Sequence, residues 1–209
     1  LFITTVYNKL NLANGGDKVP IYLDHAHNSL PKPKEVGQAM ADALNAPLDG
    51  TLIEKAARKA EIFFHSPGSY LFTANRTQAL KIILEQILPP DGQLLYIGLW
   101  TDGLGKLLEG NITIPLDRKG QIDLAQVEAQ ISPQTKLILT HYACPLTGTI
   151  LPWKEIQALA HKYEIPMVLD ISAAVGLLPL ELNDCDLAIF PGHTGLLCPP
   201  GIAGLYISP

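Results

Sequence analysis

Charge is the scarcest property of this sequence. Of its 209 residues only 17% are charged, against roughly 25% in an ordinary globular domain. The 15 Lys and Arg residues are outnumbered by 20 Asp and Glu residues, which gives a net charge of −5. No basic block is present that could neutralise the phosphates of a nucleic acid, so nucleic-acid binding is not expected. A surface with so few charges is expected to be partly covered by another domain or subunit.

Cysteines and long apolar runs are also scarce. Cys144, Cys185 and Cys198 are an odd number without a CxxC pair, so neither a disulfide scaffold nor a metal site is predicted. The longest apolar runs, such as residues 165–169, have the length of a strand and not of a membrane span. The N-terminus lacks a signal-peptide pattern. We therefore expect a cytoplasmic protein without membrane contact, and the start at Leu1 instead of Met suggests a fragment or processed piece.

The apolar residues that are present, 47% of the chain, are arranged in short runs that 17 Gly and 17 Pro residues separate. Seven β-rich runs predict strands at residues 70–73, 93–97, 111–114, 136–141, 166–170, 186–190 and 202–207. Helical periodicity or helix-start signals predict helices at residues 34–45, 52–65, 77–88, 124–131 and 153–163. Because strands and helices alternate, the fold class is α/β with a mostly parallel sheet, and no linker divides residues 1–209 into more than one domain.

Polar and small residues follow several of these strands. In open α/β sheets, ligands bind beyond the carboxyl ends of the strands. The segments to consider for function are therefore residues 75–77, 100–102, 141–149, 170–174 and 191–199.

Five segments in register carry a family resemblance: YLDHAHNSLPKPKEV from residue 22, LFTANRTQALKIIL from 71, LDRKGQIDLAQVEAQISPQTKLILTHY from 116, TGTILPWKEIQALAHKYEIPMVLD from 147 and AIFPGHTGLLCPPGIAGLYI from 188. Together they resemble class V aminotransferases, in the cysteine-desulfurase-like branch. The resemblance implies fold type I of the pyridoxal phosphate (PLP) enzymes, whose large domain is a mostly parallel seven-stranded sheet with helices on both faces. It also implies that residues 1–209 are this large domain alone, without the family's small C-terminal domain and its nucleophilic cysteine.

The position of the family's catalytic lysine is altered. Where the family has roughly G-H-K-G, this sequence has Gly192, His193, Thr194 and Gly195. A threonine hydroxyl cannot form the Schiff base that PLP chemistry requires. No lysine follows Lys162 that could replace it from a neighbouring position. The resemblance therefore implies no catalytic residue at position 194.

Other cofactor-binding positions are retained in the resemblance. Asp170 matches the carboxylate that keeps the pyridine nitrogen protonated, although a strand-end Asp also commonly caps backbone amides. Asn75, Arg76 and Thr77 match a phosphate-binding Asn-Ala-Thr turn at the start of a helix, and the alternative is an ordinary N-cap. Arg76 could either add a phosphate contact or fill the pocket. His193 matches a phosphate contact, and the alternative is a structural histidine.

Two further positions depart from the family. The ring-stacking histidine aligns with Thr101, between Trp100 and Asp102, and a stacking role for Trp100 remains open. The family's donor to the ring hydroxyl aligns with Ala173, whose side chain cannot donate a hydrogen bond.

These departures favour a degenerate PLP-fold domain with a binding, regulatory or assembly role, in which covalent PLP is not expected. The first alternative is an enzyme: a PLP-dependent cysteine desulfurase or C–S lyase seen as a fragment or altered form. Noncovalent binding of PLP or of another phosphorylated small molecule also stays open. A third hypothesis is that the chain contributes only an interface, as a homodimer or with a heterologous protein partner.

Overall fold

The computed structural model describes residues 22–46, 50–99 and 110–209. In the described residues, seven strands form one sheet in the order β1-β7-β6-β5-β4-β2-β3. The strands are β1 (Ser69–Thr73), β2 (Gln93–Ile97), β3 (Ile112–Ile114), β4 (Thr135–His141), β5 (Met167–Asp170), β6 (Leu187–Pro191) and β7 (Ala203–Ile207).

The sheet is parallel apart from one strand. Strands β2 to β6 pair in parallel with one another, whereas β7 runs antiparallel to both of its neighbours, β6 and β1. Strand β1 therefore points in the same direction as β6. The carboxyl ends of β1, β2, β4, β5 and β6 consequently meet at one edge of the sheet, which is the edge where the sequence predicts the functional residues.

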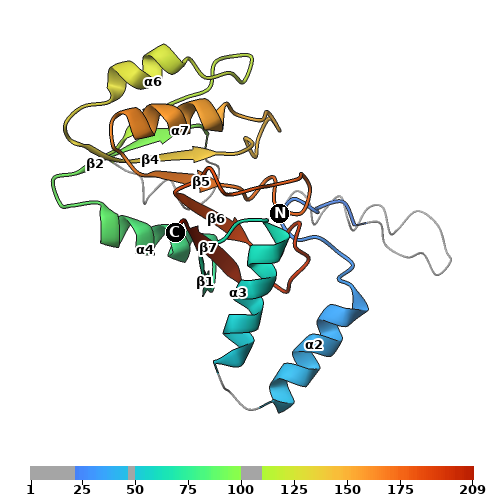
Figure 1. Cartoon of the computed structure of the whole chain (residues 1–209). Helices are drawn as coiled ribbons and strands as arrows, with labels where there is room; N and C mark the ends of the chain where they lie inside the picture. Colours follow the sequence, from blue (N-terminus) through green and yellow to red (C-terminus); the bar gives the residue numbers. More distant parts are fainter. Residues whose placement is uncertain (1–21, 47–49, 100–109) are drawn as a thin grey trace, which may run out of the picture.

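Helices cover both faces of this sheet (Figure 1). They are α2 (Lys34–Asn45), α3 (Thr51–Phe63), α4 (Arg76–Ile87), α6 (Leu124–Gln130) and α7 (Trp153–Lys162). Helix α4 buries Leu80 and Ile83 in one apolar cluster with alternate residues of the central strands. Helices α6 and α7 close a second cluster on the opposite face, which includes Val127 and Ile156. Two buried faces explain why the central strands are continuous apolar runs.

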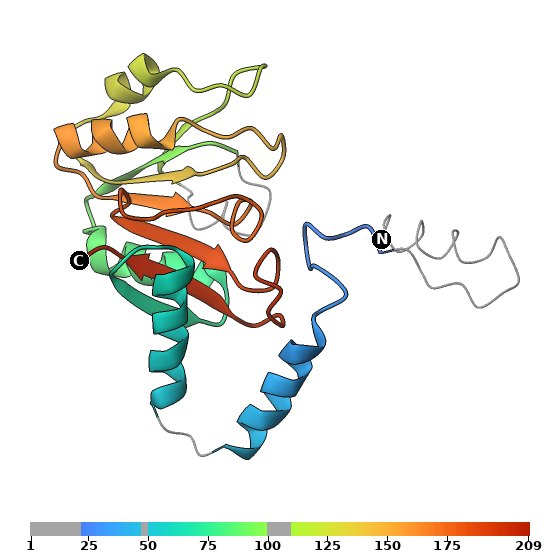
Figure 2. The same cartoon turned by 45° about the vertical axis from the view of Figure 1, so that its right-hand side comes forward.

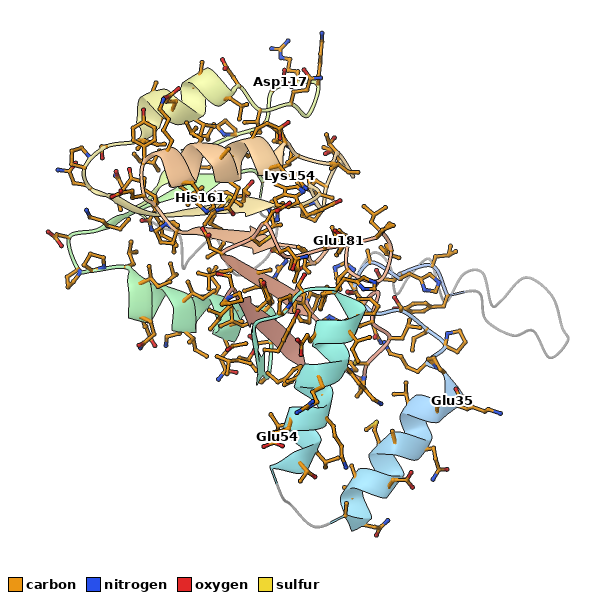
Figure 3. The ribbon with its side chains drawn as sticks, viewed as in Figure 1. Glu35, Glu54, Asp117, Lys154, His161 and Glu181 are labelled. Carbon is orange, nitrogen blue, oxygen red and sulfur yellow. The ribbon has the colours of Figure 1, made fainter. Side chains whose placement is uncertain are left out.

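The segment of α2 and the first half of α3 stands apart from the sheet (Figure 2). Neither helix contains a residue that is classed as buried. Both carry apolar side chains in solvent, with Leu44 87% exposed and Ile53 64% exposed. The labelled Glu35 lies on α2 and the labelled Glu54 on α3, in the part of the molecule that stands apart from the sheet (Figure 3). Within the described part of the chain, no helix is both long enough and apolar enough to cross a membrane.

The predicted α/β class, the mostly parallel seven-stranded sheet and the helices on both faces are confirmed. Each predicted element is present with its ends shifted by at most two residues. The helix predicted to end at residue 65 ends at Phe63 because His65 takes a left-handed conformation with φ 49° and Pro67 follows. The helix predicted to begin at Thr77 begins at Arg76, which places the arginine in its first turn.

Candidate functional site

Asp170 is the centre of the polar cluster at the carboxyl edge. It is the last residue of β5, and it lies beside His141, the last residue of β4, in the parallel register. Asp170 is fully buried and His141 is 2% exposed. Strand ends therefore bring a carboxylate and an imidazole together under the loops that close this edge.

Both carboxylate oxygens of Asp170 have partners in the protein. Oδ2 accepts a hydrogen bond from Nη1 of Arg76 at 2.9 Å, and Nδ1 of His141 lies 3.6 Å from the same oxygen. Oδ1 accepts from the backbone amide of Ser172 at 2.9 Å and also from the Ser172 hydroxyl. The carboxylate is thus held by an ion pair on one oxygen and by a local Asx-type turn on the other.

Arg76 reaches Asp170 from the start of α4. Asn75 is the N-cap of this helix, and its side-chain oxygen accepts from the backbone amide of Gln78 at 2.8 Å. Arg76 is the first helical residue, and its side chain is 16% exposed. Thr77 is exposed. The Asn75–Thr77 turn is thus the helix start that the sequence predicts, and its cap is made by Asn75.

The environment of Asp170 favours its charged form. Burial acts to raise the pKa of the Asp170 carboxyl, but the Arg76 guanidinium, His141 and the Ser172 hydrogen bond together hold it below its ordinary value. A buried carboxylate with an opposite charge within hydrogen-bond distance behaves in this way. Asp170 is therefore an anion that is already neutralised from within the chain.

The loop after β6 carries His193 and Thr194. The N-terminal segment lies against it: the carbonyl oxygen of His193 accepts from Nζ of Lys32 at 2.7 Å and from the backbone amide of Ser29 at 3.3 Å. Burial and the positive charges of Lys32 and Arg76 lower the pKa of the His193 imidazole. The amine of Lys32 thus contacts the loop that carries a lysine in the family. Lys32 and His193 are 161 residues apart in the sequence.

The hydroxyl of Thr194 is buried and has no hydrogen-bond partner among the described residues. The loop around it is packed closely, because a Cβ added at Gly195 would lie 1.8 Å from the carbonyl oxygen of Val175. Only glycine allows the two strand-end loops to approach this closely. The backbone carbonyl of Thr194 accepts a hydrogen bond from the amide of Leu197 at 2.9 Å, so only the side-chain hydroxyl is left without a partner among the described residues.

A family model described as aminotransferase class-V matches residues 50–209. The chain belongs to the class-V aminotransferase family. Among curated relatives of this class-V chain, a cysteine desulfurase of Synechococcus elongatus is 36% identical over 95 residues, which are 44% of this chain and 15% of the relative. A probable cysteine desulfurase of Halalkalibacterium halodurans is 28% identical over 170 residues, which are 73% of this chain and 41% of the relative.

Solved structures support the same fold. The apo cysteine desulfurase of Thermococcus onnurineus superposes with a TM-score of 0.73 and 22% identity, over 90% of this chain and 53% of that one. A NifS-like protein superposes with a TM-score of 0.74 and 20% identity, over 90% of this chain and 58% of that one. The class-V chain thus spans no more than about half the length of the curated relatives named above and somewhat more than half of these structures. The likeness shows the large-domain fold of cysteine desulfurases.

The residues of this class-V domain do not fit PLP as the family holds it. Thr194 has no amine, and Ala173 has no side-chain donor. An aspartate is present at position 170, but both of its carboxylate oxygens are engaged within the chain, Oδ2 by Arg76 and Oδ1 by Ser172. Of the predicted site residues, Arg76 and Asp170 are in contact. The positive charge of Arg76 contributes to the lowered pKa of His193. Asn75 is the N-cap of α4. Trp100, Thr101 and Asp102 lie outside the described residues.

Sequence alone indicated no role for His141, Ser172 or Lys32. The sequence positions of His141 and Ser172 could have indicated their roles. His141 ends a strand, and Ser172 follows Asp170 by two residues, as an Asx turn requires. Lys32 had no such signal, because its partner is remote in the sequence.

Proposed function

We propose that this class-V, cysteine-desulfurase-like domain is a degenerate member of its family, with a binding, regulatory or assembly role in place of PLP catalysis. The observation that carries the proposal is Thr194 at the lysine position, with its hydroxyl buried and unpaired among the described residues. A hydroxyl cannot condense with an aldehyde to give an imine, so it cannot anchor the cofactor covalently. The expected cytoplasmic location belongs to the same proposal.

The surface supports a role through a protein partner. Apolar side chains are exposed on α2 and α3, and they include Met40, which is 50% exposed, and Ile62, which is 71% exposed. Apolar surface that forms one contiguous patch is typical of interaction sites, and we propose that these side chains form such a patch. A second copy of the chain is the partner that we propose first, because most oligomers of soluble proteins are symmetric homo-oligomers. A heterologous protein is the alternative.

The proposal is tested by treating the purified chain with PLP and then with borohydride. We expect no internal-aldimine absorption band, and no phosphopyridoxyl label in a peptide map of the loop around Thr194 or at Lys32. A cysteine desulfurase with its own lysine, carried through the same procedure, is the positive control. A stoichiometric label at one lysine of this chain, formed at equimolar PLP, would contradict the proposal.

A second candidate function is a PLP-dependent cysteine desulfurase in altered or partial form. The retained, fully buried Asp170 favours it, because a buried carboxylate at the end of this strand is the family's pyridine-nitrogen partner. Under this hypothesis, Thr194→Lys combined with a small domain from a relative restores release of sulfide from cysteine. The matched control is Thr194→Ser in the same fusion, which removes only a methyl group and supplies no amine. Equal inactivity of the two fusions, both folded, would argue against the enzyme.

A further inference from the structure

Arg76 occupies an unfavourable place for a cation. It is the first residue of a helix of 12 residues, where the helix dipole and the free backbone amides favour negative charge. Its guanidinium turns inward from this position to Asp170. The side chain is therefore stabilised by the carboxylate, and not by the helix on which it lies.

Asp170 in turn requires a cation. An ionised carboxylate that is fully buried is costly unless it is paired and hydrogen-bonded. Ser172 satisfies one oxygen with neutral donors, and this leaves the charge itself to be compensated at Oδ2. Among the described groups within hydrogen-bond distance of Oδ2, the permanent cation is Arg76.

We propose that Arg76 is a built-in replacement for a bound cation at this site: its guanidinium occupies Oδ2 of Asp170 and so competes for this carboxylate with the protonated nitrogen of a pyridine ring. The inference rests on the proposed function, and it adds the reason why this domain keeps a buried carboxylate without a cofactor. The class of ligand that Arg76 displaces is a planar, protonated nitrogen ring that carries a phosphate.

The start of α4 extends the argument to the phosphate. Arg76 lies between Asn75 and Thr77 at the N-terminus of α4. Backbone amides at a helix N-terminus favour the binding of an anion. Arg76→Ala recreates the Asn-Ala-Thr turn of the family and removes the guanidinium from Asp170 in a single substitution. The substitution therefore frees the carboxylate and leaves the helix start, with its Asn75 cap, in place to receive the phosphate.

The test uses pyridoxine 5′-phosphate, the alcohol form of the cofactor, because it has no aldehyde and cannot label lysines. Calorimetric titration of the wild-type chain is expected to give no saturable heat. Arg76→Ala is expected to bind at least about tenfold more tightly than the wild type. Arg76→Ala combined with Asp170→Asn is expected to lose this gain, because the carboxylate that pairs with the ring nitrogen is absent. Arg118→Ala, in an exposed turn, is the matched control and should behave as wild type.

The inference remains testable if Arg76→Ala does not fold alone. In that case the double variant, which lacks both charges, is expected to melt at a higher temperature than Arg76→Ala, and pyridoxine 5′-phosphate is expected to restore folding to the single variant. Equal binding by the wild type and Arg76→Ala would overturn the inference. So would equal binding by the single and double variants, or an unfolded single variant that the ligand does not restore.

These outcomes separate the two proposals. An aldimine in the wild-type chain contradicts the proposed function, whatever Arg76→Ala binds. Failure of Arg76→Ala to gain the phosphorylated alcohol contradicts the role of Arg76 alone, because Thr194 still lacks an amine.

Discussion

Asp170 and Thr194 differ in what each position costs the fold. A threonine at position 194 leaves one buried hydroxyl without a hydrogen-bond partner among the described residues, which costs about 1–3 kcal/mol. Losing the cation beside Asp170 would leave a buried charge uncompensated, which is far more destabilising. The carboxylate can persist because Arg76 and Ser172 satisfy it. A retained catalytic carboxylate is therefore weak evidence for retained catalysis when a neighbouring residue supplies its counter-ion.

The Arg76–Asp170 pair should dominate the acid sensitivity of this region. The folded state lowers the pKa of Asp170, whereas the pKa of an unfolded Asp is about 3.9. The stabilisation is therefore fully present above about pH 4 and is lost as the pH falls through the lower, folded-state pKa. We expect Arg76→Ala to lower the free energy of unfolding at pH 7 by about 3–5 kcal/mol, as measured by urea denaturation.

Urea denaturation of the wild type and of Asp170→Asn between pH 7 and pH 3 tests the direction of the pKa shift of Asp170. The difference between the wild type and Asp170→Asn should shrink as the pH falls, because protonation of Asp170 removes the charge that Arg76 pairs with. Lys81→Ala is a suitable control, since its ion pair with Glu85 is exposed, with 3.6 Å between the charged atoms. A constant difference across this pH range would contradict an ionised, paired Asp170.

At the scale of single residues, candidate site residues could be predicted from this sequence, but their side-chain partners could not. The candidates Asp170, Arg76 and His193 could be proposed because each matches a family position or follows a strand. Their partners could not, because Arg76 and Asp170 are 94 residues apart and Lys32 and His193 are 161 apart. The sequence leaves two roles open for Arg76, a phosphate contact or a filled pocket, and both stay predictions. The contact with Asp170 is a further role that the sequence did not indicate.

At the scale of helices and strands, prediction was much more successful. Strand β5 (Met167–Asp170) is buried at every position, so its apolar run identified it without help from distant residues. Helix α4 shows the same point, since Ala79, Leu80 and Ile83 form one stripe and all are buried. The order of the strands could not be read in this way, because it depends on which runs pair across the sheet. The local sequence pattern predicts where a strand or helix lies, whereas the order of the strands depends on pairing between residues that are distant in the sequence.

Helix α4 should depend strongly on its apolar stripe. Leu80 is completely buried in the cluster with β6 and β7. Leu80→Ala is expected to lower the free energy of unfolding by about 2–5 kcal/mol, since it leaves a cavity in a packed core. Denaturant unfolding measures this, and Gln86→Ala, at an exposed position of the same helix, provides a comparison that lacks the cavity. Similar losses for the two variants would show that α4 does not pack as the structure has it.

At the scale of the whole molecule, exposed apolar side chains are found on α2 and α3, although these helices carry a larger share of charged residues than the 17% of the whole chain. Helix α2 has no buried residue, and α3 contributes to the core only through partly buried side chains of its second half, such as Ala57 and Ala60. Relatives that are about twice as long, or longer, share the fold of this chain. A surface of this composition is more stable when it is covered, and a second copy of the chain offers the same apolar surface in return.

The last prediction concerns this surface in solution. If α2 and α3 pair between two copies, sedimentation should show a species of about twice the 22.6 kDa chain mass at high concentration. Leu44→Ser together with Ile53→Ser is expected to shift the equilibrium to monomer. Each substitution acts twice in a symmetric contact, and burying one such side chain contributes about 1.5–3 kcal/mol. Asp42→Ser with Lys55→Ser, on the same two helices, should leave the mass unchanged. A wild-type monomer at every concentration would exclude the homodimer and leave a heterologous partner as the occupant of these helices.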